Sequence, residues 1–355
     1  MRLPPQSPKR SERGIAMIIV MLTIIVLAVL AGGFAYSMKV ETRLAKNTSL
    51  DTDLEWLGRS GVELARYVLS QSMTLDLSDN LRQKWAGGTG NTNDVLADIS
   101  LVDNRVGEGM FSIKIVDAER KLNINRVDGP MLQQALTMVG CDPAEFSMVS
   151  DSILDWIDRD DKARLAGAEN EYYLSLKPPY VAKNGPMGDI SELLLVRGMT
   201  PAIYWGPASN NAAQPTRRST QLGLLRQPGS SFGSVGMVDL FTALSSGQVN
   251  PNTAGQPVLE LMLGSAQAAS EAIRHRAGYD GVEGDDDDTP FTSPAEVAAM
   301  MQIPQGGGGI PGAPGGGPAA NFTSLFTTRS MTFEVQVDAR IAGYRRKFIA
   351  LLRRQ

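Results

Sequence analysis

The chain has 355 residues, of which 43% are hydrophobic and 20% charged, and its formal net charge is −4. The apolar fraction excludes disorder throughout, and the slightly acidic balance argues against binding nucleic acid through its phosphates. The single cysteine, Cys141, cannot form an intrachain disulfide. The single histidine, His275, excludes most zinc sites and most histidine-based acid–base catalysis. The composition favours a non-enzymatic protein of two or three compact units, at about 100–200 residues per unit.

Residues 15–38 carry no charged side chain and predict a membrane-spanning helix. At about 1.5 Å per residue this segment reaches about 36 Å, which exceeds a hydrocarbon core of about 30 Å. Four basic residues precede it: Arg2, Lys9, Arg10 and Arg13. The positive-inside rule therefore predicts a cytoplasmic N-terminus and places the remainder of the chain on the far side of the membrane.

The hydrophobic pattern continues past residue 38 with a helical period. Apolar or small residues recur mostly three or four positions apart from Val40 to Val68, with polar residues between them. One helix over about 15–71 is predicted, apolar all round in its first half and amphipathic in its second. A cleaved secretory signal is the alternative, but its apolar stretch would be shorter, about 7–15 residues. We favour a retained anchor.

Three segments predict β-strands. In residues 109–116, Phe111, Ile113 and Ile115 alternate with Met110, Ser112 and Lys114. This period of two, with β-branched residues, is typical of a half-buried strand. Residues 330–339 alternate in the same way, and residues 344–352 can return after a short turn as the second strand of an antiparallel hairpin. Together these strands predict a small sheet, which the amphipathic half of the long helix covers.

Between these strands, two segments share the order Asn-x-Asn, a turn and an apolar-periodic helix: residues 121–136 and 248–263. We expect the second asparagine of each, Asn125 and Asn252, at a turn or cap position. A further helix is predicted downstream of each segment. This order predicts a duplicated module resembling the helix-hairpin-helix or SAM-like class. A role in DNA binding is not favoured, because the region has no basic stripe.

The N-terminal residues resemble the leader of type IV pilins and type II secretion pseudopilins, which is short, basic and ends in glycine before an apolar helix. The resemblance implies that prepilin peptidase cleaves after Gly14 and methylates the new N-terminus, Ile15. Most members of the family carry a glutamate five residues into the mature chain, where this sequence has Ile19. An apolar residue at that position is similar to the K subunit of the general secretion pathway.

Internal motifs extend the resemblance to the K pseudopilin family over most of the chain. They are GVELARYVL (61–69), DAERKLNIN (117–125), LDWIDRDDKARLAGAENEYYLSLKPPYVAKNGPM (154–187), SELLLVRGMTP (191–201) and VNPNTA (249–254). The resemblance implies an α+β fold, with a pilin-like long N-terminal helix on a small antiparallel sheet and a large inserted all-α domain. It also implies a position at the tip of the pseudopilus with the I and J pseudopilins.

The expected domain organisation follows from these segments. Its parts are a basic leader (1–14), the transmembrane half of the helix (15–38), the amphipathic helix with the first strands of the head (39–120), the inserted duplicated α-helical domain (121–304), a Gly/Pro-rich linker (305–318) and the C-terminal strands (319–355).

The acidic segment after Trp156 suggests a metal site. Asp158, Asp160 and Glu169 fall at positions 1, 3 and 12 of an EF-hand-like loop, although the match is partial. Oxygen ligands without histidine or cysteine suit calcium, and members of the resembled family bind calcium in the head. We therefore expect structural Ca²⁺ held by these three residues and Glu171. The alternative is a solvated acidic loop, which is our interpretation of the second acidic run at 285–288.

The resemblance implies a minor pseudopilin of the type II protein secretion system that supports export of folded proteins from the periplasm. It would be a single-pass protein of the bacterial inner membrane, with its head in the periplasm. Expected partners are I- and J-type minor pseudopilins, prepilin peptidase and the inner-membrane secretion platform, with no nucleic acid. Two alternatives remain: a type IV pilus minor pilin, and a membrane-anchored metal-dependent hydrolase that uses Asp158 and Asp160.

Overall fold

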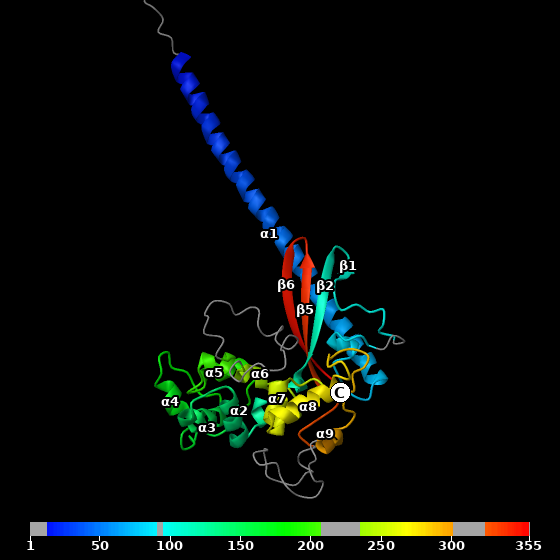
Figure 1. The fold of residues 1–355 in the computed structure, drawn as a ribbon. Coiled ribbons are helices and arrows are strands. Elements are labelled where there is room, and N and C mark those ends of the chain that lie inside the picture. The colour runs from blue at the N-terminus through cyan, green and yellow to red at the C-terminus, as the bar shows by residue number, and fades with distance from the viewer. Residues whose placement is uncertain (1–12, 91–94, 207–234, 301–323, 355) are drawn as a thin grey trace, which may run out of the picture.

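A computed structural model describes residues 13–90, 95–206, 235–300 and 324–354. A long helix runs into a small antiparallel sheet, and a group of short helices lies beyond the far end of the sheet (Figure 1). The Gly/Pro-rich stretch predicted as a linker at 305–318, and residues 1–12 of the predicted leader, lie outside the described residues.

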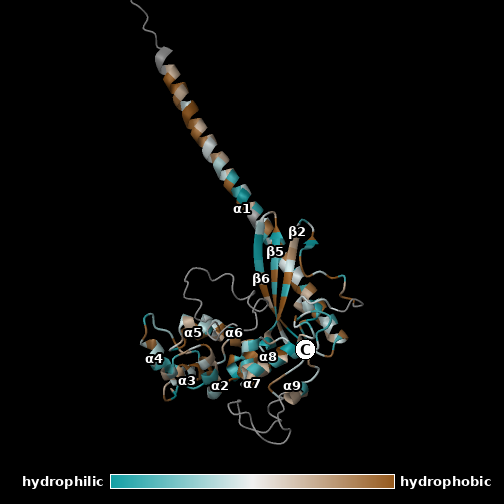
Figure 2. Ribbon diagram, in the orientation of Figure 1, coloured by the Kyte–Doolittle hydropathy of each residue, from teal (hydrophilic) through white to brown (hydrophobic). Residues whose placement is uncertain are grey.

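The long helix α1 (Arg13–Leu75) has two halves of different character. In its first half every described side chain from residue 16 to 46 is exposed, and an 18-residue window reaches a mean hydropathy of 2.8. Figure 2 shows this half mainly in brown, whereas the part nearer the sheet is more polar. Further along, Leu54, Leu57, Ala65 and Val68 are buried. The long helix predicted from the hydrophobic period is confirmed, and α1 is long and apolar enough to cross a membrane.

The sheet has four strands in the order β1–β2–β5–β6, all antiparallel. The strand predicted at 109–116 is β2 (Gly109–Asp117), and the predicted hairpin consists of β5 (Thr332–Ile341) and β6 (Tyr344–Arg353). The short edge strand β1 (Asn104–Val106) was not predicted, since three residues give no alternation to detect.

Alternating side chains of β2 and β5 form the first hydrophobic core, beneath α1. Ile113 and Ile115 of β2 lie opposite Val337 and Val335 of β5, with Phe111 and Phe333 at the two ends of this buried row. The short helix η1 (Lys84–Ala86) adds Trp85, whose ring meets that of Phe333 edge to face at 5.1 Å. Such aromatic pairs stabilise a fold beyond the area they bury. The amphipathic helix and the sheet thus close one core between them.

Helix α1 approaches the sheet closely because two of its residues lack side chains. A Cβ atom at Gly61 would lie 2.5 Å from Cγ1 of Val337, and one at Gly58 would lie 2.6 Å from Cδ2 of Phe348. Real Cβ atoms do not approach other heavy atoms so closely, so a larger residue at either position forces the helix or the strand to move.

We expect Gly61→Ala to destabilise the head by about 1–2 kcal/mol. Overpacking typically costs about 1–3 kcal/mol, and the better helix propensity of alanine offsets up to about 1 kcal/mol of it. Thermal unfolding of the full chain in detergent measures the change. Gly33→Ala is the matched control, because a Cβ at Gly33 meets no atom within 4 Å. Equal unfolding temperatures for Gly61→Ala and the parent chain would contradict the close approach.

A second hydrophobic core lies among the helices that follow β2 in the chain. Leu132, Leu136, Ile153, Tyr173 and Phe241 are among its fully buried side chains. The elements of this part of the chain are η2 (Ala118–Arg120), β3 (Leu122–Asn123), η3 (Ile124–Arg126), α2 (Gly129–Met138), η4 (Pro143–Glu145), α3 (Phe146–Ile157), α4 (Asn170–Leu174), η5 (Ile190–Leu195), α5 (Pro201–Trp205), α6 (Met237–Leu240), β4 (Phe241–Thr242), α7 (Gln256–Leu263), α8 (Ala266–Arg276) and α9 (Pro294–Met300).

The two Asn-x-Asn segments make matching contacts with distant parts of the chain. Asn125 exchanges two hydrogen bonds with the backbone of Met187, at 3.0 and 2.7 Å. Asn252 does the same with Phe291, at 2.9 and 2.8 Å. Both asparagines lie at turns, but the oxygen that accepts the local backbone N–H belongs to the first asparagine of each pair. The second asparagine instead fixes a distant loop just ahead of a later helix.

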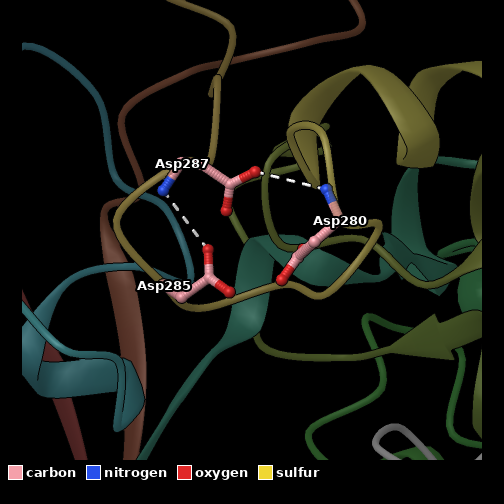
Figure 3. Close-up of side chains that lie close together, drawn as sticks. All are labelled: Asp280, Asp285 and Asp287. Atoms are coloured by element: carbon pink, nitrogen blue, oxygen red, sulfur yellow. Dashed lines mark hydrogen bonds between the residues drawn. The ribbon is translucent and has the colours of Figure 1, made fainter.

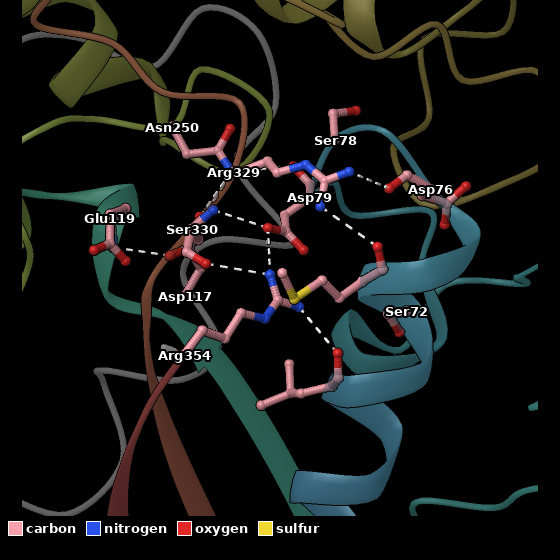
Figure 4. A network of polar contacts seen from close by, with 12 residues as sticks. Ser72, Asp76, Ser78, Asp79, Asp117, Glu119, Asn250, Arg329, Ser330 and Arg354 are labelled. Carbon is pink, nitrogen blue, oxygen red and sulfur yellow. Dashed lines mark hydrogen bonds and ion pairs between the residues drawn. The ribbon is translucent and has the colours of Figure 1, made fainter.

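A buried polar network joins the sheet to the helical part (Figure 4). Asp117, at the end of β2, accepts hydrogen bonds from Ser330 (2.6 Å), Thr253 (2.5 Å) and Asn250 (3.4 Å). Glu119, which is fully buried, accepts from the backbone of Ser246 and Thr332, both at 3.0 Å. Because these donors come from segments far apart in the chain, the network fixes the helical part against the sheet.

Asp117 is expected to make the stability of the head depend on pH near neutrality. Burial raises the pKa of Asp117 to about 7, although hydrogen bonds from Ser330 and Thr253 oppose the rise. Between about pH 4 and 7 the native carboxyl therefore holds a proton that the unfolded chain has lost. Stability falls as the pH rises through this window and then levels off.

The change would be on the order of a few kcal/mol, at about 1.4 kcal/mol per pKa unit. Unfolding of the full chain, measured from pH 5 to 8.5, should show a steeper fall for the parent than for Asp117→Asn. The exposed Asp98→Asn is the control. Parallel curves for all three chains would contradict a protonated Asp117.

Candidate functional site

The acidic residues predicted to bind a metal lie in the loop between α3 and α4. Helix α3 places Trp156 in the second core and Asp155 beneath the loop, where its side chain is fully buried. Asp155 accepts hydrogen bonds from the backbone N–H and the guanidinium of Arg164, the latter at 2.6 Å. The same guanidinium nitrogen lies 2.6 Å from Oδ2 of Asp158. The loop is therefore folded back onto the end of its own helix.

Glu169, the residue before α4, carries the most unusual environment in this loop. It is only 4% exposed, yet neither carboxylate oxygen has a hydrogen-bond partner among the described residues. Burial, together with four neighbouring aspartates at 155, 158, 160 and 161, raises the pKa of Glu169 to about 7. A buried carboxylate without a partner is costly unless a cation or a proton compensates it.

Two further buried oxygens, one in this loop and one in a segment beside it, lack a hydrogen-bond partner among the described residues: Oδ1 of Asp158 and Oδ1 of Asn184. Asn184 belongs to a segment that lies against the loop, since its Nδ2 donates to the backbone oxygen of Asp160 at 2.8 Å. Carboxylate and amide oxygens are the ligands that Ca²⁺ prefers, and its coordination tolerates irregular loops. The donor set fits a hard divalent cation.

The predicted ligands differ in how well the structure places them. Asp158 and Asp160 influence the pKa of Glu169 electrostatically, but the structure does not bring the carboxylate oxygens of these three residues within 4.8 Å of one another, which among the described residues is seen for Asp280, Asp285 and Asp287. Glu171 is exposed in the first turn of α4, and the acidic groups that raise the pKa of Glu169 are aspartates. Asp161 was not predicted, and it accepts from Asn170 at 2.9 Å. Asn184 was also not predicted, because it is distant from the loop in sequence although it contacts Asp160 in the structure.

The second acidic run forms a cluster of its own (Figure 3). Carboxylate oxygens of Asp280, Asp285 and Asp287 lie within 4.8 Å of one another. Two of these carboxylates accept hydrogen bonds from nearby backbone N–H groups. Oδ2 of Asp287 accepts from Tyr279 at 2.7 Å, and Oδ1 of Asp285 accepts from Asp287 at 3.3 Å. Such turns satisfy the carboxylates without a cation, in contrast to Glu169.

The predicted processing junction, Gly14–Ile15, lies in the first turn of α1, directly before the exposed apolar side chains that begin at residue 16. Cleavage and methylation at this junction remain predictions.

Comparisons with known proteins give one consistent result. A family model described as type II secretion system protein K matches residues 111–206. A type II secretion system protein K of Klebsiella pneumoniae is 27% identical over 54% of this chain and 60% of its own length. The corresponding protein of Pseudomonas aeruginosa is 25% identical over 79% of this chain and 77% of its own length. The chain thus spans about three fifths of the first of these relatives.

The fold also resembles a solved structure, the GspK-GspI-GspJ complex from the type 2 secretion system of enterotoxigenic Escherichia coli. The TM-score is 0.59 at 15% identity, and the match covers 88% of this chain and 94% of the other. At this level of identity the likeness concerns the fold alone. It includes the long N-terminal helix and the antiparallel sheet.

Proposed function

We propose that the chain is a member of the type II secretion system protein K family, whose model matches residues 111–206, and that it is a minor pseudopilin at the pseudopilus tip. In this role it supports export of folded proteins from the periplasm, and its function is assembly and not catalysis. The type IV pilus and hydrolase alternatives are not favoured, because the relatives are secretion components.

The observation that supports this proposal most strongly is the division of α1 into two halves. The exposed apolar half can lie in the lipid bilayer before assembly. Once the subunit has left the membrane, the same half can pack in the helical core of a fibre. The other half is fixed to the sheet by buried leucines and by the close approach at Gly61. A single continuous helix can therefore transmit the position of the head to the fibre without a flexible joint.

The bulk of the helical part suits the end of a fibre. It lies beyond the sheet, on the side away from the apolar half of α1 (Figure 1). A subunit of this shape would obstruct another subunit stacked above it, whereas a terminal subunit has one free side. We therefore propose contacts with I- and J-type pseudopilins below the head. Prepilin peptidase and the inner-membrane platform are proposed as earlier partners along the assembly route.

A structural calcium ion is part of the proposal. Glu169, Asp158 and Asn184 would hold it through the buried oxygens that lack protein donors, and Asp160 and Asp161 would add negative charge. When bound, the cation supplies positive charge that compensates the buried carboxylates and rigidifies the loop. Because only the folded head presents these oxygens together, binding stabilises the head by mass action.

The N-terminus of the mature chain tests the proposed route into the membrane and the fibre. We expect mass spectrometry of the chain isolated from its own bacterium to find Ile15 as the first residue, with a methylated amine. Deletion of the gene is expected to abolish secretion, and Gly14→Leu should leave the leader uncleaved and fail to restore secretion. A mature chain that begins beyond residue 38, or unimpaired secretion in the deletion strain, would overturn the proposal.

A further inference from the structure

The edge strand β6 is a long strand whose outer side has no partner among the described residues. It pairs with β5 along its whole length, and the order of the sheet ends there. In Figure 1 it lies at the margin of the sheet, with α1 behind. A strand in an antiparallel sheet directs half of its backbone hydrogen-bonding groups to each side, so alternate residues of β6 direct their donors and acceptors away from β5.

The side chains of β6 that face away from α1 follow a regular chemical pattern. Lys347, Ile349, Leu351 and Arg353 alternate along the strand and are exposed, Ile349 to 73% and Leu351 to 48%. Two apolar side chains are therefore flanked by two cations on one face of the edge. The intervening residues, such as Phe348, are partly buried and belong to the core beneath α1.

The two flanking cations are available for a partner. Arg345 is paired with Asp338, and Arg346 lies 3.6 Å from Asp51 of α1. Lys347 and Arg353, in contrast, have neither an ion pair nor a side-chain hydrogen bond within the part of the chain that the structure describes. Charges on an edge strand also discourage non-specific pairing. Lys347 and Arg353, however, leave Ile349 and Leu351 exposed between them.

A second copy of this chain does not complement all four positions in the register that pairs its apolar residues with each other. Antiparallel self-pairing centred on Ala350 would match Ile349 with Leu351, but it would also set Lys347 directly opposite Arg353. Like charges directly opposite each other destabilise a strand pair. A strand with acidic residues at both flanks and β-branched residues between them would satisfy all four positions.

We propose that β6 is a docking edge for an extended segment of another protein, which adds as a fifth strand. The segment carries carboxylates opposite Lys347 and Arg353 and apolar β-formers opposite Ile349 and Leu351. Backbone hydrogen bonds supply affinity, and the alternate side chains select the sequence. This inference concerns only the sheet edge and does not depend on the calcium site or on the position in the fibre.

The probe is a fluorescent, end-blocked peptide of sequence Thr-Glu-Thr-Val-Thr-Ile-Thr-Glu-Thr, added to the full chain in detergent micelles. We expect saturable binding by anisotropy, together with slower hydrogen exchange confined to residues 344–353. Lys347→Glu and Arg353→Glu should each weaken binding about threefold or more, since each converts an attractive cross-strand pair into a repulsive one. Arg105→Glu, on the opposite edge strand, is the matched control and should leave binding unchanged.

A charge-swapped peptide, with lysine in place of both glutamates, distinguishes a specific edge from general attraction. It should bind the Lys347→Glu, Arg353→Glu double variant and not the parent chain. The proposal is overturned if the peptide does not bind, if Arg105→Glu weakens binding as much as the β6 variants, or if exchange slows elsewhere. It is equally overturned if the parent chain pairs with itself through β6, because that outcome makes a second copy the occupant.

Discussion

Replacing Arg354 with methionine is expected to lower the free energy of unfolding of the head by about 3–5 kcal/mol. Its guanidinium lies 2.6 Å from Oδ2 of Asp79 in an ion pair that is almost fully buried, with side-chain exposures of 11% and 4%. Removing one partner of such a pair leaves the other charge buried and uncompensated, which costs about this much.

The same guanidinium connects three parts of the head (Figure 4). It donates to the backbone oxygens of Ser330 and Leu69, each at 3.2 Å, and lies 4.6 Å from the ring centre of Phe333. The end of β6 is thereby fixed to α1 and to the loop that follows it. Methionine retains much of the side-chain length but none of these donors.

Thermal and denaturant unfolding of the full chain in detergent measures this loss. The neighbouring Arg353→Met is the control, because that side chain is exposed. A loss below about 1 kcal/mol for Arg354→Met, or an equal loss for Arg353→Met, would contradict the role of the buried pair.

Calcium is expected to stabilise the parent chain and to leave the Glu169→Gln chain unchanged. At a free concentration one hundred times the dissociation constant, a ligand specific to the folded state adds about 2.7 kcal/mol. Glutamine keeps the shape of Glu169 but removes the charge that the cation compensates. Because it also removes an unpartnered buried carboxylate, this variant should fold at least as well as the metal-free parent.

Unfolding in the presence of chelator, Ca²⁺ or Mg²⁺ measures this difference, and isothermal titration counts the sites. Asp280→Asn, in the second acidic cluster, is the control and should respond to Ca²⁺ as the parent does. Equal stabilisation of the parent and Glu169→Gln by Ca²⁺ would place the site elsewhere. If Ca²⁺ does not stabilise the parent chain, the proposed calcium site is wrong.

Much of the fold could be predicted from periodicity, because one physical rule governs each element. The two halves of α1 follow from where apolar residues fall on a helix, and β2 and β5 follow from alternation. Strand β6 follows from the short turn that returns the chain after β5. The edge strand β1 could not be predicted, since its pairing depends on a neighbour and not on its own three residues.

The candidate site was predictable only in its local part. Asp158, Asp160 and Glu169 lie within one loop, so their spacing along the chain is informative. Asn184 joins them only after the chain has passed through α4 and returned, and sequence spacing contains no sign of that return. The same reason explains the asparagine contacts: Asn125 and Met187 are distant in sequence and adjacent in space.

The proposed position at the tip is tested most directly by photo-crosslinking from the exposed surface of α1. A photoreactive amino acid in place of Leu44, which is 60% exposed, samples the helix that would contact neighbouring subunits. In the native bacterium the account expects adducts with I- and J-type pseudopilins and none between two copies of this chain. Abundant self-adducts, or the absence of adducts with any other pseudopilin, would contradict a single terminal subunit.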